Sequence, residues 1–156
     1  VVLRRKCPGL KPVTEAMDSR SWMLEVRSWK VKEMIKSYKD LEVYQSAYQL
    51  AINVHQMTQN YPDYERYELG GQLRRAATSI PMNIAEGYGK KRSVKDFKRF
   101  LLMALGSCNE VQVLLDMSKD LGYIGESKHG KLTKEYEILG RRLNVMIDKW
   151  QTKPSS

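Results

Sequence analysis

His55 and His129 are the side chains best suited to acid–base catalysis or metal binding. A di-metal site in a helical bundle needs Glu-x-x-His pairs on facing helices. Only His129 has a glutamate three residues earlier, Glu126, which lies in a Gly-rich turn. No arginine precedes either histidine at the five-residue spacing typical of helical toxin ribonucleases, and the sequence has no phosphate loop and no serine elbow. We therefore expect no catalytic residues, no metal and no cofactor.

The most prominent charged feature is a run of cations around one predicted helix start. Ser93 is the expected N-cap, with Asp96 three residues later at the capping-box spacing. The cations on either side of this cap are Lys90, Lys91, Arg92, Lys95, Lys98 and Arg99. A helix amino terminus carries unpaired N–H groups and partial positive charge, so the pattern predicts a phosphate-binding corner. An ordinary solvated loop is the alternative.

A second pair of cations, Arg74 and Arg75, lies within an otherwise apolar helical segment. One interpretation adds both arginines to the nucleic-acid contacts. The other places Arg75 in a structural polar network that fixes helix alignment, with Ser107 as a further partner. The residues of this network are Arg75, Ser79, Asn83, Glu86 and Glu110.

Composition places the chain among basic globular proteins. It has 156 residues, of which 42% are hydrophobic and 29% charged, and 27 Lys and Arg residues against 18 Asp and Glu residues give a net charge of +9. Such an excess favours anionic partners. Cys7 and Cys108 form neither a metal-binding nor a redox spacing, and the nearly continuous apolar stretch 100–105 is far shorter than a membrane span. We expect a cytoplasmic protein without membrane contact.

Apolar periodicity predicts four helices, at about 40–60, 65–86, 93–121 and 127–150. The stripe expected to be buried on the first contains Leu41, Tyr44, Tyr48, Ala51, Ile52 and His55. That on the second contains Leu69, Leu73, Ala76, Ala77, Ile80 and Ile84, with a kink or a locally broken hydrogen bond expected near Ala77 because Pro81 lies inside the helix. The third helix has two apolar rows that are expected to be buried. The first contains Phe97, Leu101, Ala104, Leu105, Cys108, Val111 and Leu115, and the second contains Phe100, Met103 and Leu114.

Short links between these helices predict an all-α, antiparallel, up-down-up-down four-helix bundle over residues 36–151. Residues 1–35 are expected to be an extension that is poorly ordered or forms one short helix. Met34 is a candidate translation start, which would leave the preceding residues outside the native protein. Residues 152–156 are expected to be a frayed tail.

Two blocks carry a family resemblance. They are KSYKDLEVYQSAYQL (36–50) and QLRRAATSIPMNIAEGYGKKRSVKDFKRFLLMALGSCNE (72–110). With them, residues 36–150 resemble the four-helix-bundle proteins encoded by intervening sequences within bacterial 23S ribosomal RNA genes. The resemblance implies a bundle that assembles as a ring-like homopentamer. A related group, the accessory variability proteins of diversity-generating retroelements, associates with a reverse transcriptase and with nucleic acid through a basic surface.

The leading hypothesis is therefore a non-enzymatic, basic, homo-oligomeric protein associated with nucleic acid, either ribosomal RNA or its intervening sequence. The alternative is an accessory subunit that docks a partner such as a retroelement reverse transcriptase. Its contact would be apolar and salt-resistant, through exposed Tyr61, Tyr64, Tyr67 and Tyr88. A third interpretation is a passenger protein without a function in its host.

Overall fold

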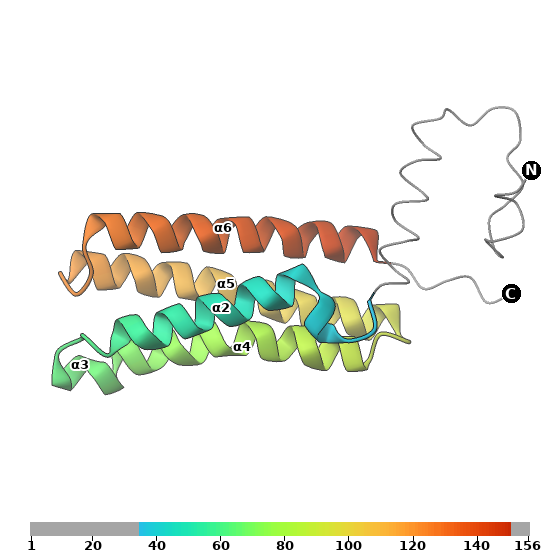
Figure 1. The fold of residues 1–156 in the computed structure, drawn as a ribbon, viewed down its shortest axis with the longest axis horizontal. Coiled ribbons are helices and arrows are strands. Elements are labelled where there is room, and N and C mark those ends of the chain that lie inside the picture. The colour runs from blue at the N-terminus through green and yellow to red at the C-terminus, as the bar shows by residue number, and fades with distance from the viewer. Residues whose placement is uncertain (1–34, 151–156) are drawn as a thin grey trace, which may run out of the picture. The chain divides into compact units, whose positions relative to one another are not determined.

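The computed structural model describes residues 35–150, which form helices and, within that range, no strand (Figure 1). The expectations for residues 1–34 and 151–156 fall outside the described residues. The elements in chain order are a 3-10 helix η2 (Tyr38–Asp40), α2 (Glu42–Thr58), α3 (Asp63–Tyr67), α4 (Leu69–Gly89), α5 (Val94–Asp120) and α6 (Glu126–Lys149).

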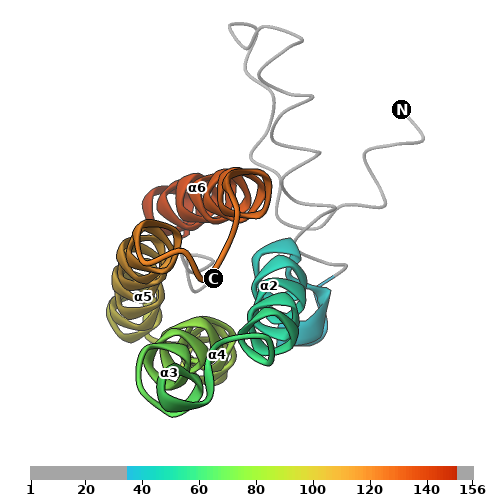
Figure 2. The same ribbon diagram turned by 90° about the vertical axis from the view of Figure 1, so that its left-hand side faces the viewer.

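The long helices α2, α4, α5 and α6 pack as an antiparallel four-helix bundle, as the sequence predicts. Consecutive long helices are in contact, and α6 also contacts α2, so each helix has two neighbours. Seen along the bundle, α2 lies diagonally opposite α5 (Figure 2). Because α2 starts, α4 ends and α5 starts at one end of the bundle, the turn between α4 and α5 lies beside η2 (Figure 1).

Two of the predicted caps are present. Ser37 and Asp40 form a reciprocal capping box at η2, in which the Ser37 backbone N–H donates to Asp40 Oδ2 at 2.8 Å. At the start of α5, Ser93 Oγ accepts a hydrogen bond from the Asp96 backbone N–H at 3.2 Å. Both caps satisfy backbone N–H groups that the first turn of a helix leaves without partners.

The second predicted helix is divided at Glu68, which separates α3 from α4. At the break the Leu69 backbone N–H donates to Glu65 Oε2 at 3.3 Å, and the Arg66 carbonyl accepts from Arg74 Nη2 at 2.9 Å. These side chains replace the backbone bonds that a continuous helix would make. Pro81 does not end the helix. It is buried inside α4, which continues to Gly89.

The core confirms the apolar stripe predicted on α4 and most of that on α5, but it corrects the stripe on α2. Leu41 and Ala51 of the predicted stripe are buried, but the main buried row of α2 is Val43, Ala47, Leu50, Val54 and Met57. Tyr48 and Ile52 are exposed, as is His55, because the purely aliphatic row packs more closely against neighbouring helices. Met103 on α5 is likewise exposed, whereas Phe100 and Leu114 are buried.

Helix α5 is, among the described residues, long and apolar enough to span a membrane by the criteria of length and composition. A core helix of a bundle meets the same criteria. Within the fold α5 packs against both α4 and α6, and its fully buried side chains include Phe97, Leu101, Val111 and Leu115.

Candidate nucleic-acid interface

The six cations predicted to form a phosphate-binding corner surround the turn between α4 and α5. Lys90, Lys91 and Arg92 are exposed in the turn itself. Lys95, Lys98 and Arg99 follow at i, i+3 and i+4, so they share one face of the first turns of α5. The structure therefore brings the predicted cations together at one end of the bundle, next to the amino terminus of a long helix.

Two lysines of this corner lie over aromatic rings. Lys90 Nζ is 4.6 Å from the centre of the Phe100 ring and 3.5 Å from Glu86 Oε1, and Lys91 Nζ is 3.8 Å from the centre of the Tyr88 ring. Both rings are themselves buried, so cation–π contacts hold the lysine chains against the surface while their ammonium groups stay in water.

The remaining cations of the corner have few partners. Arg92, Lys95 and Lys98 make no hydrogen bond or ion pair within residues 35–150, and Arg99 lies 5.3 Å from the centre of the Phe100 ring. Lys95 and Arg99 are like charges at i, i+4, an arrangement that destabilises an isolated helix by a few tenths of a kcal/mol. Within the described residues, Lys90 is therefore the only one of these six cations with a carboxylate partner.

Arg74 and Arg75 behave differently from one another. Arg74 Nη1 donates to Thr58 Oγ1 at 3.0 Å, and its Nη2 donates to the Arg66 carbonyl, so Arg74 ties α2, α3 and α4 together. Arg75 is exposed and makes no hydrogen bond within the described residues. A Cβ on Gly70 would lie 3.3 Å from Arg74 Nη1, which shows how closely the guanidinium covers that glycine.

The predicted polar network is only partly connected. Ser79 Oγ lies 2.5 Å from Ser107 Oγ, which links α4 to α5, and Asn83 Nδ2 donates to the Ser79 carbonyl at 2.8 Å. Glu86 pairs with Lys90 instead of joining them. Arg75 and Glu110 are exposed and lie outside these bonds. Among the residues of this network, the polar link between α4 and α5 is therefore the contact between the hydroxyl groups of Ser79 and Ser107.

Neither histidine lies in a metal-binding group. Within residues 35–150 no three His, Cys, Asp or Glu side chains are placed to hold a metal ion. His55 Nε2 is 3.1 Å from Thr78 Oγ1, joining α2 to α4. His129 Nε2 is 2.6 Å from Asp116 Oδ1, a contact that sequence reasoning missed because the two residues pair only when α5 and α6 lie side by side.

The tyrosines proposed for partner docking divide into two groups. Tyr64 and Tyr67 are strongly exposed, as expected. Tyr61 and Tyr88 are buried, which corrects the prediction: Tyr61 packs 5.4 Å from the Tyr123 ring, and Tyr88 lies beneath Lys91. Burial also raises the pKa of the Tyr61 hydroxyl.

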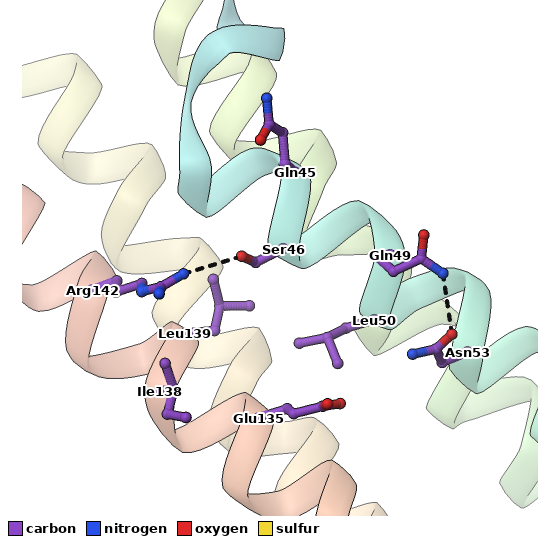
Figure 3. Close-up of a pocket in the computed structure, with 9 residues that line it drawn as sticks. All are labelled: Gln45, Ser46, Gln49, Leu50, Asn53, Glu135, Ile138, Leu139 and Arg142. Atoms are coloured by element: carbon purple, nitrogen blue, oxygen red, sulfur yellow. Dashed lines mark hydrogen bonds between the residues drawn. The ribbon is translucent and has the colours of Figure 1, made fainter. Parts of the chain in front are cut away.

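The groove between α2 and α6 was not predicted from the sequence (Figure 3). Its volume is about 430 Å³, and its apolar lining comes from Leu50, Ile138 and Leu139. The polar lining consists of Gln45, Ser46, Gln49, Asn53, Glu135 and Arg142. Arg142 Nη1 donates to Ser46 Oγ at 3.3 Å across the groove.

Comparison with known proteins identifies the family. Residues 39–145 match the family described as 23S rRNA-intervening sequence protein. The chain belongs to this family. The matched range contains η2 except Tyr38, all four long helices except the last residues of α6, the cationic corner and the groove. No curated protein sequence matches this family member.

The fold of this intervening-sequence protein is also found in a solved structure. It is similar to the crystal structure of a protein of unknown function from the S23 ribosomal protein family of Bacteroides thetaiotaomicron, with a TM-score of 0.63 and 21% identity. The similarity covers 69% of this chain and 96% of that chain. At this identity it shows a shared bundle fold, and the shared fold does not assign a function.

Proposed function

We propose that this intervening-sequence protein is a non-enzymatic, basic, homo-oligomeric bundle of the cytoplasm that associates with RNA, either 23S ribosomal RNA or its intervening sequence. The cationic corner around the turn between α4 and α5 carries the proposal. Between residues 86 and 99 its six basic side chains are accompanied by two carboxylates, Glu86 and Asp96, of which Glu86 pairs with Lys90.

Unpaired cations at a helix amino terminus suit a phosphate backbone. Each phosphate that meets a lysine or arginine releases condensed counterions, and this release provides binding energy without sequence preference. Backbone N–H groups at the helix start add hydrogen-bond donors. The family description, 23S rRNA-intervening sequence protein, agrees with an RNA as the polyanion.

Self-association is supported by two exposed apolar faces. One contains Tyr48 and Ile52 of α2 and Met82 of α4, and lines a groove of about 470 Å³. The other lies on α5 and contains Leu102, Met103, Val113 and Met117, which are 46% to 59% exposed. Since α2 and α5 are diagonal in the bundle (Figure 2), the faces point in different directions. Two different faces that meet head to tail generate a ring when the rotation closes, which agrees with the homopentamer that the resemblance implies.

A partner-docking role is the second candidate. Tyr64 and Tyr67 are 71% and 74% exposed beside the break between α3 and α4, where large aromatic side chains can anchor a protein contact. A reverse transcriptase docked there would bind with little dependence on salt, unlike RNA on the cationic corner.

The test is binding of a 23S rRNA fragment that includes the intervening sequence, measured by fluorescence anisotropy. Replacing Lys90, Lys91 and Arg92 by alanine should weaken binding about a hundredfold at 0.1 M salt, because three phosphate contacts are lost. The matched control replaces Lys128, Lys131 and Lys134, three exposed lysines of α6, and should bind nearly as well as the unmodified protein. Equal losses of RNA affinity in the two variants would show that binding depends on the overall positive charge and not on the cationic corner. That result would contradict the proposal.

A further inference from the structure

The groove between α2 and α6 contains a carboxylate oxygen that has no hydrogen-bond partner among residues 35–150. Glu135 Oε2 is buried and accepts no hydrogen bond from these residues, and Figure 3 shows its side chain reaching from α6 toward Leu50 and Asn53 of α2. A buried carboxylate oxygen that lacks a donor costs free energy, and native proteins rarely retain one without a reason. Because this oxygen is covered in the unliganded protein, a ligand that brings N–H groups into the groove would satisfy it once the half-buried Glu135 side chain turns toward the ligand.

The other lining groups define what such a ligand must offer. The apolar side chains Leu50, Ile138 and Leu139 suit a flat ring with a weakly polar face. Arg142 uses Nη1 on Ser46 and retains further N–H donors, which need acceptors on the ligand. Gln49 donates to Asn53 Oδ1 at 3.2 Å, so the Asn53 amide is held in place with its N–H donors available.

Among the four RNA bases, guanine matches this set of groups. Its N1–H and N2–H donors lie side by side on one edge, where a carboxylate can accept both, and its O6 and N7 acceptors suit an arginine. Adenine and cytosine each offer one amino group there, and uracil a single N–H. We propose that the groove between α2 and α6 binds a guanine base, with Glu135 accepting from N1–H and N2–H and Arg142 donating to the opposite edge.

The dimensions of the groove agree with a purine. Glu135 and Arg142 are two helical turns apart on α6, about 10 Å along the axis, which a purine with a hydrogen bond on each side can span. The volume of about 430 Å³ lies within the range of small-ligand sites. Single-stranded RNA is commonly recognised through bases turned out of the stack, and for an RNA source the inference rests on the proposed function.

The experiment measures binding of GMP, AMP, CMP and UMP to the full-length protein by isothermal titration calorimetry. The variant is Glu135→Gln, which replaces an acceptor oxygen by an amide donor, and the matched control is Glu137→Gln, an exposed glutamate of the same helix. GMP should bind the unmodified protein at least tenfold more tightly than AMP. Glu135→Gln should remove that preference and Glu137→Gln should retain it. Thermal unfolding of Glu135→Gln should not occur at a lower temperature, because the variant removes an unpaired buried carboxylate.

A second arm compares a twelve-nucleotide uridine RNA with the same RNA carrying one guanine. Tighter binding of the guanine-containing RNA supports the groove as a reader of RNA. Preference for GMP without preference for this RNA supports the guanine site and assigns it to a free nucleotide. Equal binding of GMP and AMP, or a GMP preference that survives in Glu135→Gln, overturns the inference. Failure of uridine RNA to bind at low salt would instead contradict the proposed function.

Discussion

Arg74 and Arg75 are adjacent in the sequence, yet within residues 35–150 only Arg74 makes side-chain hydrogen bonds. Its hydrogen bond to the Arg66 carbonyl replaces a backbone bond lost at the break between α3 and α4, and its hydrogen bond to Thr58 Oγ1 joins the break to α2. The sequence shows two equivalent cations within an apolar helix. Their different roles follow from the position of the break at Glu68, which periodicity alone did not place.

Arg74→Ala should therefore lower the free energy of unfolding by about 1–3 kcal/mol, because it leaves the Arg66 carbonyl and Thr58 with fewer partners. Arg75→Ala, at an exposed position without a hydrogen bond among the described residues, should change it by less than about 0.5 kcal/mol. Urea denaturation of both variants measures the difference. Similar values for the two would show that Arg74 does not hold the break.

Cys108 is buried, as its place in the apolar row of α5 predicts. It lies in an apolar helical row and is fully buried, and burial raises the pKa of its thiol to about 12. The neutral thiol is the form that the fold favours. The unfolded chain releases this proton near pH 9 and the folded chain only near pH 12, so the thiol makes stability fall as pH rises between these values.

The free energy of unfolding of the unmodified protein should thus decrease above pH 9, with a contribution from Cys108 of up to about 1.4 kcal/mol per pH unit. Burial likewise raises the pKa of Tyr136, and the nearby Cys108 and Glu135 add to that shift. Cys108→Ala should show a shallower decrease in the same pH series. Parallel curves for the two proteins would indicate that the thiol titrates alike in the folded and unfolded chain.

At the scale of the element, helix faces could be predicted where a single apolar row exists. The row of α4 and most of those of α5 are buried as expected, although α5 also carries a shorter apolar row that stays exposed and includes Leu102 and Val113. Helix α2 has two rows with helical spacing, about 120° apart at 100° per residue. Sequence reasoning chose the row with tyrosines, whereas the fold buries the aliphatic row that includes Val43, Leu50 and Val54.

Most contacts between elements could not be predicted from the sequence, although Ser107 was expected as a partner of the polar network on α4 and does contact Ser79. The cationic corner could be predicted because its residues are close in sequence and share one cap. The α2–α6 groove and the His129–Asp116 contact join residues from separate helices, so they depend on which helices become neighbours and in what register. Periodicity defines a face of each helix, but it does not define the register between helices.

The packing of α4 on α5 can be tested at Gly87. A Cβ at this position would lie 2.7 Å from the Phe100 Cβ and 3.0 Å from Phe97 Cδ2. Gly87→Ala should destabilise the protein by about 1–3 kcal/mol through overpacking. Gly89→Ala, where a Cβ meets nothing within 4 Å, should be neutral or slightly stabilising. Thermal unfolding provides the comparison, and a neutral Gly87→Ala would show that the two helices are further apart than described.

At the scale of the whole molecule, the exposed apolar side chains and the exposed cations lie on different parts of the bundle. Apolar side chains on α2, α4 and α5 are available for contact between copies, while cations gather at the turn between α4 and α5. A ring would repeat the cationic corner once per copy. Such repetition raises the effective affinity for a long polyanion without any new contact.

Light scattering of the purified protein should therefore give a mass several times the 18.1 kDa of one chain. Val113→Glu, on the exposed face of α5, should shift the mass toward the monomer, because it places a charge within an apolar contact. Lys131→Glu, a charge change at an exposed position of α6, should leave the assembly intact. A monomer in the unmodified protein would contradict self-association.

The salt dependence of RNA binding tests the central claim most directly. If six phosphates meet the six cations of the corner, the logarithm of the binding constant should fall against the logarithm of salt concentration with a slope on the order of −4 to −5. Replacing Lys90, Lys91 and Arg92 by alanine should reduce the slope to about half. A binding constant indifferent to salt, absence of binding at about 50 mM salt, or an unchanged slope in the variant would contradict the claim that this corner binds RNA.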